Sequence, residues 1–359
     1  MASRATAAPA PGSPCPTPCE AGPWSGRAVR AHDGYRHEAF LWKGEGEFLA
    51  GTVPFILDGL VAGQPVMVAV IQQRIDLLRT ALGPDAAAAV IFVDMAEIGR
   101  NPARIIPAWR SFLDEHGAGG RPVRGIGEPV WAGRRPAEVT ECQVHEALLN
   151  LAVEPHVPLW LLCPYDVEAL AADVVTEAQR SHPTLVDVDS HRPSTLYGGS
   201  RHVRTVFASD LPQVGSVAFR RELSVDALLP VRQDVLEHAA AAGVPAGRRD
   251  DLALAVHEVA ANSIEHAGGT GLLRIWQDDE ALVCEIRDVG RIQDPLVGRT
   301  LPAWDDEGGR GLWMANHLCD LVQVRSGSRG TTVRISTWLQ PDARRARTAL
   351  AGDQDRRRP

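Results

Sequence analysis

The sequence predicts an α/β protein of two domains: a three-layer domain on a parallel sheet, then a sandwich of helices on one face of an antiparallel sheet. Three observations support this fold class. The length of 359 residues suits two domains of ordinary size. In the first half, short continuous apolar runs alternate with helical stretches. In the second half, two long helical patterns are followed by pairs of strands.

The first domain is expected over residues 29–190. Its buried parallel strands are the continuous apolar runs 66–71, 89–95 and 159–165. Its helices are the stretches 72–82, 101–116 and 136–152. The last of these has Pro136 in its first turn, which is a favoured position for proline at a helix start. Strands and helices that alternate in this order predict a layer of helices on each face of the sheet.

The second domain is expected over residues 216–340. Residues 191–215 carry Gly, Ser, Pro and His without a clear period and are expected to connect the domains. The domain's expected elements are a strand at 216–223, helices at 226–243 and 246–268, and hairpins at 271–290 and 321–339. Residues 341–359 are rich in arginine and are expected to form a solvated tail.

Composition excludes several classes of protein. Hydrophobic residues make up 45% of the chain, and the net charge is −8, without the basic excess of general nucleic-acid binders. No run approaches the ~18 apolar residues of a membrane span. Residues 1–28 are rich in proline, lack the apolar segment of a secretory signal, and are expected to be disordered. We therefore expect a cytoplasmic protein that binds neither nucleic acid nor membranes.

Lysine and cysteine usage is equally restrictive. Lys43 is the only lysine, and its context, LWKGEGEF, excludes a Walker A phosphate loop. The six cysteines form no CxxC pair and no His/Cys cluster at zinc spacing, which excludes a disulfide scaffold and a zinc finger. Cys15 and Cys19 are close enough in sequence to form a metal or redox pair, although scattered thiols are the simpler interpretation.

Three polar residues repeat every fourth position in the helix expected at 246–268. Glu258, Asn262 and His266 are each one turn apart, about 6 Å along the axis, so they project from one face. Such a row is also compatible with an ordinary solvated face.

Three further blocks follow downstream. Asp288 is followed at the second position by Gly290, which permits a tight turn against a flat ligand. The aperiodic segment 291–308 has the length of a functional lid. The stretch GGRGL at 308–312 places glycine-rich backbone at a helix start, which is a typical phosphate site. The block GTTV at 330–333 then places hydroxyls on a strand.

Together these blocks resemble the GHKL ATP-binding fold of DNA gyrase, histidine kinases and MutL, and within it the anti-sigma serine/threonine kinase branch. HEVAANSIEHA resembles the N box, and DVG, GGRGLWM and GTTV resemble three glycine boxes, in the right order over 216–340. The resemblance implies that ATP and Mg²⁺ are bound. Asn262 would hold Mg²⁺, and Glu258 would accept the proton of the attacking hydroxyl. Asp288 would accept a hydrogen bond from the adenine amino group, beside Gly290 and Thr331.

The second glycine box would hold the phosphates. The resemblance implies that amides of Gly309, Arg310 and Gly311, with Leu312 at the helix start, wrap the phosphate groups. His266 is a further candidate for phosphate contact, with a structural role as the alternative. The first glycine box departs from the DxGxG pattern because Ile292 replaces its second glycine, which predicts a different lid hinge and a changed nucleotide affinity.

The first domain resembles the MEDS family of sensory domains, which is related to the RecA/KaiC fold. The resemblance covers about 30–187 and rests on HEAFLW, GRPVRGIGEPVWAG, HEALLN and LLCPYD. It implies a sensory role without nucleotide hydrolysis. His37, Glu128, Trp131 and Tyr165 lie near expected strand ends, where open α/β sheets bind ligands, and are candidates to contact the signal. Structural roles in turns and interfaces remain the alternative.

These resemblances predict a signal-responsive regulator that phosphorylates a serine or threonine of an anti-sigma antagonist of the STAS type and also sequesters a sigma factor. Two alternatives stay open: a nucleotide-gated binding module without phosphotransfer, and a two-component histidine kinase. The second is disfavoured because no helix with a central exposed histidine precedes the ATP-binding blocks. Relatives of the second domain often form dimers, so a homodimer also stays open.

Overall fold

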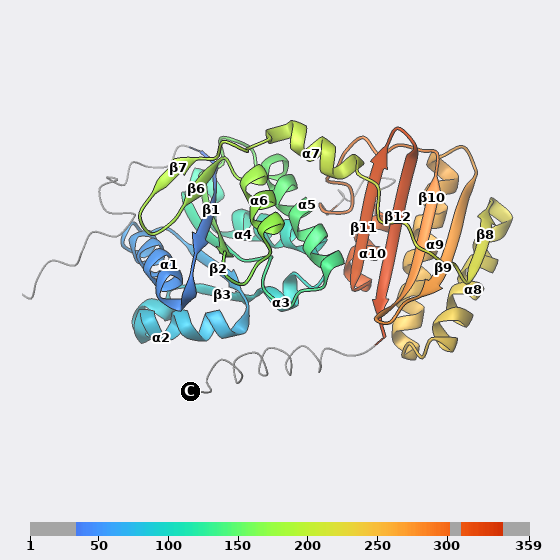
Figure 1. Ribbon diagram of the computed structural model, residues 1–359, viewed down its shortest axis with the longest axis horizontal. Helices are drawn as coiled ribbons and strands as arrows, with labels where there is room; N and C mark the ends of the chain where they lie inside the picture. Colours follow the sequence, from blue (N-terminus) through green and yellow to red (C-terminus); the bar gives the residue numbers. More distant parts are fainter. Residues whose placement is uncertain (1–33, 302–309, 340–359) are drawn as a thin grey trace, which may run out of the picture.

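The computed structural model describes residues 34–301 and 310–339, and two sheet-based domains lie side by side in it (Figure 1). The tails expected at 1–28 and 341–359 lie outside the described residues. Within the described ranges, no helix has the length and apolar character needed to cross a bilayer.

The first domain is built on a seven-stranded sheet in the order β3-β2-β4-β5-β1-β6-β7. The strands are β1 Arg36–Trp42, β2 Val66–Val70, β3 Ile91–Asp94, β4 Val123–Gly127, β5 Leu159–Asp166, β6 Thr184–Val186 and β7 His191–Pro193. All neighbouring strands are parallel except β6 and β7, which are antiparallel at the edge. The expected parallel sheet is therefore confirmed.

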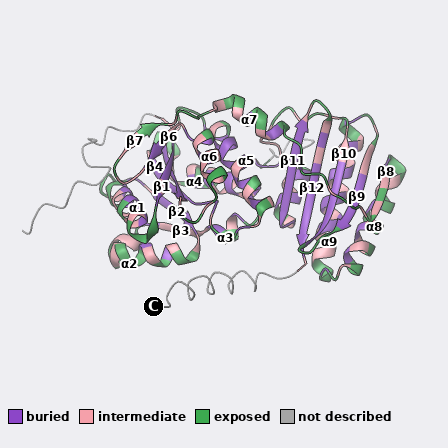
Figure 2. Ribbon diagram, in the orientation of Figure 1, coloured by how far each residue is buried: buried purple, intermediate pink, exposed green. Residues whose placement is uncertain are grey.

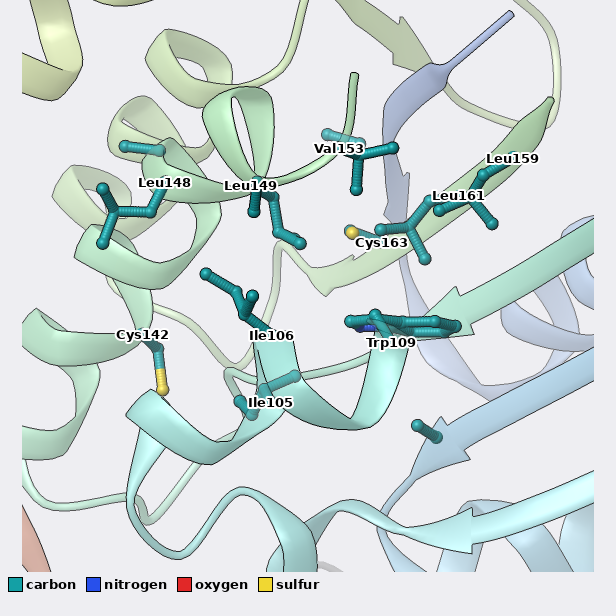
Figure 3. Packing of buried hydrophobic residues seen from close by; sticks show 14 of the residues in the cluster. Ile105, Ile106, Trp109, Cys142, Leu148, Leu149, Val153, Leu159, Leu161 and Cys163 are labelled. Atoms are coloured by element: carbon teal, nitrogen blue, oxygen red, sulfur yellow. The ribbon is translucent and has the colours of Figure 1, made fainter. Parts of the chain in front are cut away.

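Helices cover both faces of this sheet, as in a three-layer domain. One face carries α1 Gly44–Val61 and α2 Gln72–Ala88, and the other carries α3 Met95–Ile98, α4 Ile105–His116, α5 Pro136–Ala152 and α6 Ala172–Ser181. Buried residues, coloured purple in Figure 2, include most of the sheet, and two clusters of buried apolar residues pack between the helices and the strands. Figure 3 shows Trp109 of α4 and Leu149 of α5 in the same core as Leu161 and Cys163 of β5. Gly125 of β4 makes room for the indole, because a methyl group there would lie 2.5 Å from Trp109 Cζ3.

The second domain is a sandwich of an antiparallel sheet and three helices. Its strands follow the order β11-β12-β10-β9-β8. They are β8 Phe219–Leu223, β9 Gly271–Gln277, β10 Ala281–Asp288, β11 Leu321–Gly327 and β12 Gly330–Trp338. The helices α8 Leu228–Ala241, α9 Ala246–His266 and α10 Arg310–Leu318 share one apolar core with the sheet. Both expected hairpins and the sandwich are therefore confirmed.

The segment expected as an unpatterned connection contains regular structure. Besides β7, it forms α7 Gly199–Ala208. Val203 of this helix is buried in the core of the first domain, and Phe207, one turn later, is buried in the core of the second. The helix is therefore stabilised by packing on both domains, which a local period does not reveal. The helix expected at 72–82 also continues to Ala88, across a kink at Gly83, whose φ is 75°.

The two domains meet where α5 lies beside β11 (Figure 1). Glu141 of α5 is fully buried and pairs with Arg325 of β11, and its other oxygen lies 3.5 Å from Arg299 Nη2. Nearby, Asn101 Nδ2 donates to Asn316 Oδ1 of α10 at 3.1 Å. The first domain thus contacts the β11 edge and α10 of the second. Near the start of α5, Arg135 also pairs with Glu280, and Ala137 packs against the cluster around Trp276 and Trp338.

Candidate functional site

The site in the second domain begins with the polar face of α9. Leu252, Val256 and Val259 are buried in the core beside this polar face and fix the orientation of the helix on the sheet. Glu258 and Asn262 are half-buried. His266 ends the helix with 65% of its side chain exposed. The four-residue spacing therefore places Glu258 and Asn262 in a shielded position, whereas His266 lines the cavity described below from an exposed position.

The carboxylate of Asp288 is held at the end of β10 by two donors. Ser263 Oγ, on α9, donates to Oδ2. The backbone N–H of Gly290 donates to Oδ1 at 2.8 Å. These bonds orient the carboxylate at the junction of helix and strand, with its remaining acceptor sites available to a ligand. Ser263 was missed by the sequence analysis, although it directly follows Asn262.

Thr331 completes the strand-end part of the site. It is opposite Asp288 in the β10–β12 register. Its Oγ1 donates to the Gly290 carbonyl at 2.9 Å and lies 2.9 Å from Ser326 Oγ, which also accepts from the Ile292 N–H at 2.9 Å. Hydroxyls of β11 and β12 therefore hold the chain that follows β10 in place.

Gly290 is required by a close approach of β10 to α9. A methyl group at this position would lie 2.9 Å from Ala267 Cβ and 3.0 Å from Asp288 Oδ1. The first separation is shorter than real side chains show, and the second is tighter than most. The glycine thus lets the strand end pass directly against the end of the helix.

These residues surround a cavity of about 140 Å³. Its polar lining includes Asn262, Asp288 and Thr331, and its apolar walls are Val259, Ile292, Val297, Leu312 and Val333. A cavity of about 150 Å³ accommodates a single aromatic ring. Flat apolar walls with a few fixed hydrogen-bonding groups suit a heteroaromatic ring. Ile292, the departure from the glycine-box pattern, forms part of this wall.

The start of α10 lies against the polar face of α9. A methyl group at Gly311 would lie 2.9 Å from Asn262 Nδ2 and 3.1 Å from Glu258 Cβ. Arg310, the first residue of α10, is exposed, and Gly309 lies outside the described residues. Leu312 is buried in the cavity wall. The first turn of α10 is therefore brought next to Glu258 and Asn262.

The four sensory candidates of the first domain fall into different places. His37, at the amino end of β1, lies 3.0 Å from Glu146 Oε2 of α5, and the Tyr165 ring contacts His182 at a centroid distance of 5.7 Å. Burial lowers the pKa of His37, and the neighbouring His182 lowers it further.

The other two candidates lie elsewhere. Glu128 pairs with Arg74 of α2, on the opposite face of the sheet. Trp131 stacks under the guanidinium of Arg134, whose Cζ is 4.3 Å from the ring centroid. The structure thus brings His37 and Tyr165 together and separates them from Glu128. The sequence analysis missed their partners Glu146 and His182.

In comparisons with known proteins, two family models match different parts of the chain. Residues 36–183 match the MEDS family (MEthanogen/methylotroph, DcmR Sensory domain). Residues 222–337 match the family described as histidine kinase-like ATPase domain. A search of curated proteins finds no match.

Among solved structures, the chain is similar to the RsbU and RsbW domains of Rv1364c from Mycobacterium tuberculosis. The identity is 19% and the TM-score is 0.25. The match covers 33% of this chain and 32% of that one, so it spans about a third of each.

Proposed function

We propose that this chain, in which a MEDS domain precedes a histidine kinase-like ATPase domain, is a signal-responsive protein kinase. It binds ATP with Mg²⁺ and transfers the γ-phosphate to a serine or threonine of an anti-sigma antagonist of the STAS type. It also sequesters a sigma factor. The observation that carries the proposal is the contact of Gly311 with Glu258 and Asn262, beside the cavity that contains Asp288.

The cavity is suited to adenine. The Asp288 carboxylate, already oriented by Ser263 and Gly290, accepts a hydrogen bond from the exocyclic amino group. Val259 and Ile292 on the cavity walls cover the faces of the ring. A fixed charged acceptor in an apolar pocket contributes strongly to selectivity, because an analogue without the amino group leaves that acceptor unpaired.

The phosphate end is assigned to the junction of α9 and α10. The Asn262 side-chain oxygen is a hard ligand, next to the half-buried Glu258 carboxylate, and such oxygen donors fit Mg²⁺. Bound there, Mg²⁺ would neutralise charge on the phosphate oxygens. Backbone N–H groups at the start of α10 would point at the same oxygens, and Arg310 would add a positive charge.

Glu258 is proposed as the general base. The hydroxyl of the substrate attacks the γ-phosphorus as its proton passes to the Glu258 carboxylate. A new phosphorus–oxygen bond forms, the bond from that phosphorus to the β–γ bridging oxygen breaks, and ADP leaves. Positioning and charge neutralisation account for most of such catalysis, so a modest base suffices.

A nucleotide-gated binding module is the second candidate, and Ile292 favours it. Its N–H is bound to Ser326 on β11, so the chain after β10 is attached to the sheet where the usual pattern has a flexible glycine. A hinge restrained in this way would bind nucleotide without completing transfer.

Incubation of the full chain with labelled ATP, Mg²⁺ and candidate antagonist proteins tests the proposal. We expect label on serine or threonine, loss of transfer in Glu258→Gln with ATP still bound, and weaker Mg²⁺-dependent binding in Asn262→Asp. Glu265→Gln is the matched control, because this neighbouring glutamate is 73% exposed and should leave transfer unchanged. Tight ATP binding without label would support the binding module, and acid-labile label would support a histidine kinase. Transfer by Glu258→Gln at the parental rate would refute the assigned base.

A further inference from the structure

Four buried side chains with metal-ligating atoms converge in the core of the first domain. They are His37 of β1, Glu146 of α5, Cys163 of β5 and His182, which directly follows α6. Their ligand atoms all lie within 4.8 Å of one another. Each residue is at most 2% exposed. Four separate parts of the chain thus each contribute one potential ligand to the same small cluster.

The outer nitrogens of both histidines are engaged outside the cluster. His182 Nδ1 lies 2.7 Å from the Ala178 carbonyl, which can only accept, so Nδ1 carries the hydrogen. His37 Nδ1 lies 3.2 Å from Asn150 Oδ1, and the Asn150 amide nitrogen donates to the Ser181 carbonyl at 2.8 Å. In neutral imidazoles this arrangement leaves the Nε2 lone pairs pointing inward. At metal sites, outer acceptors fix ligating histidines in the same tautomer.

The inward nitrogens face an acceptor rather than a donor. His37 Nε2 is 3.0 Å and His182 Nε2 is 3.2 Å from the same oxygen, Glu146 Oε2. Two lone pairs and a carboxylate oxygen repel one another unless positive charge lies between them. In the described part of the chain, His182 Nε2 and Glu146 Oε1 have no hydrogen-bond partner that would relieve this.

We propose that His37, Glu146, Cys163 and His182 bind a divalent metal ion, and that the donor chemistry selects zinc. Two imidazoles, one carboxylate and one thiolate form a donor set typical of tetrahedral zinc. The carboxylate and thiolate together balance the charge of the ion, with the thiol proton released on binding.

The distances between the ligand atoms are close to those of a tetrahedral zinc site. Given bonds of about 2.0–2.3 Å, donor atoms in a tetrahedral zinc site are about 3.3–3.8 Å apart. Besides the two nitrogen–oxygen distances above, Cys163 Sγ is 3.5 Å from His37 Nε2. Because the ligand atoms span up to 4.8 Å, binding would move the two imidazoles slightly away from Glu146 Oε2 and draw the most distant pair together by about 1 Å.

The surroundings indicate a closed site. The Tyr35 ring stacks on His37 at 5.8 Å, and Tyr165 meets His182 edge-on. The core around them is apolar. With four protein ligands and no access for water, the ion would tie β1, β5, α5 and the end of α6 together rather than catalyse a reaction. The proposal does not depend on the proposed kinase activity.

Metal analysis of the full chain, expressed with added zinc and desalted, tests the proposal. We expect about one zinc per chain, as for a four-ligand structural site. Cys163→Ser and His182→Gln should each weaken zinc binding by at least about ten-fold. The matched control is Cys142→Ser, since Cys142 is buried in the same core but donates to the Pro129 carbonyl (Figure 3). A Cys15→Ser/Cys19→Ser double variant should also keep its zinc.

Cobalt substitution supplies a second readout that does not depend on how stable the variants are. Cobalt-loaded parent protein should show tetrahedral visible bands and a thiolate charge-transfer band, and the charge-transfer band should persist in Cys142→Ser. Folded parent protein without stoichiometric zinc, or zinc retained by Cys163→Ser and lost from the Cys15/Cys19 variant, would overturn the proposal. In that case the four residues form a hydrogen-bonded cluster only.

Discussion

Glu128 is a carboxyl group held in an environment that disfavours its charge. The residue is 1% exposed, and burial raises its pKa to about 8. The Arg74 guanidinium beside it opposes this rise without cancelling it. Between its ordinary pKa and about 8, the folded protein keeps a proton that the unfolded chain has released. Because only the unfolded chain is ionised at this residue in that range, the free energy of unfolding falls as the pH rises from the ordinary glutamate pKa to about 8.

We expect Glu128→Gln to remove this loss of stability. Relative to the parent, the variant's free energy of unfolding should rise between about pH 5 and about pH 8, with a slope of up to about 1.4 kcal/mol per pH unit. Urea denaturation at several pH values measures the difference. Glu115→Gln, at a glutamate that is 76% exposed, should show no such trend. A difference that is independent of pH would mean that Glu128 is ionised throughout.

At the scale of elements, the contact between α9 and α10 determines the geometry of the proposed nucleotide site. Gly311 lets the first turn of α10 touch Glu258 and Asn262. We expect Gly311→Ala to push α10 away, to cost about 1–3 kcal/mol of stability, and to weaken Mg²⁺-ATP binding. Calorimetric titration and thermal unfolding measure the two effects.

Gly247→Ala is the matched control for this contact. Gly247 lies in the first turn of α9, and a methyl group there would meet nothing within 4 Å. The free energy of unfolding of this variant should rise by about 0.5–1 kcal/mol, because alanine has the higher helix propensity. The variant should bind nucleotide like the parent. Unchanged nucleotide affinity in Gly311→Ala would contradict the assigned role of the α9–α10 contact.

Elements with local signals could be predicted from the sequence. The bounds of α5 follow from Pro136 and the apolar spacing behind it, and both hairpins of the second domain follow from alternating strands around short turns. The polar row of α9 was also visible, because four-residue spacing is a property of the helix itself.

Features that depend on long-range packing could not be predicted. α7 is held by Val203 in one core and Phe207 in the other, which no local pattern encodes. His37 and Glu146 are 109 positions apart, so the fold alone brings these ligating atoms together. A search for zinc ligands at short spacing therefore missed this cluster. The roles assigned to Glu258, Asn262 and Asp288 remain predictions, although the structure places Asn262 and Asp288 on one cavity.

At the scale of the whole molecule, α5 connects the first domain to the proposed nucleotide site. Glu146, in its middle, belongs to the buried histidine cluster, and Glu141 lies little more than one turn before it. Glu141 pairs with Arg299, in the segment that contributes Val297 to the cavity wall. In the same segment, the Gly298 carbonyl accepts from Asn316 Nδ2 of α10 at 2.7 Å. A shift of α5 would therefore reach the wall of the cavity through one ion pair.

The Glu141 ion pair is the point at which this connection can be tested. Burial lowers the pKa of Arg299 to about 10, and the Glu141 carboxylate opposes this shift by favouring the charged guanidinium. Glu141→Gln would leave Arg299 and Arg325 buried without their counter-charge, at a cost of about 3–5 kcal/mol. We expect the domains to unfold in two separate calorimetric transitions, and ATP affinity to fall about ten-fold, or about 1.4 kcal/mol, because the segment around Val297 loses its anchor. Glu154→Gln, at a glutamate that is 70% exposed just beyond α5, should change neither property. Loss of stability with unchanged ATP affinity would show that the interface holds the domains together without transmitting a signal. The ion pair would then stabilise the interface and have no effect on the cavity.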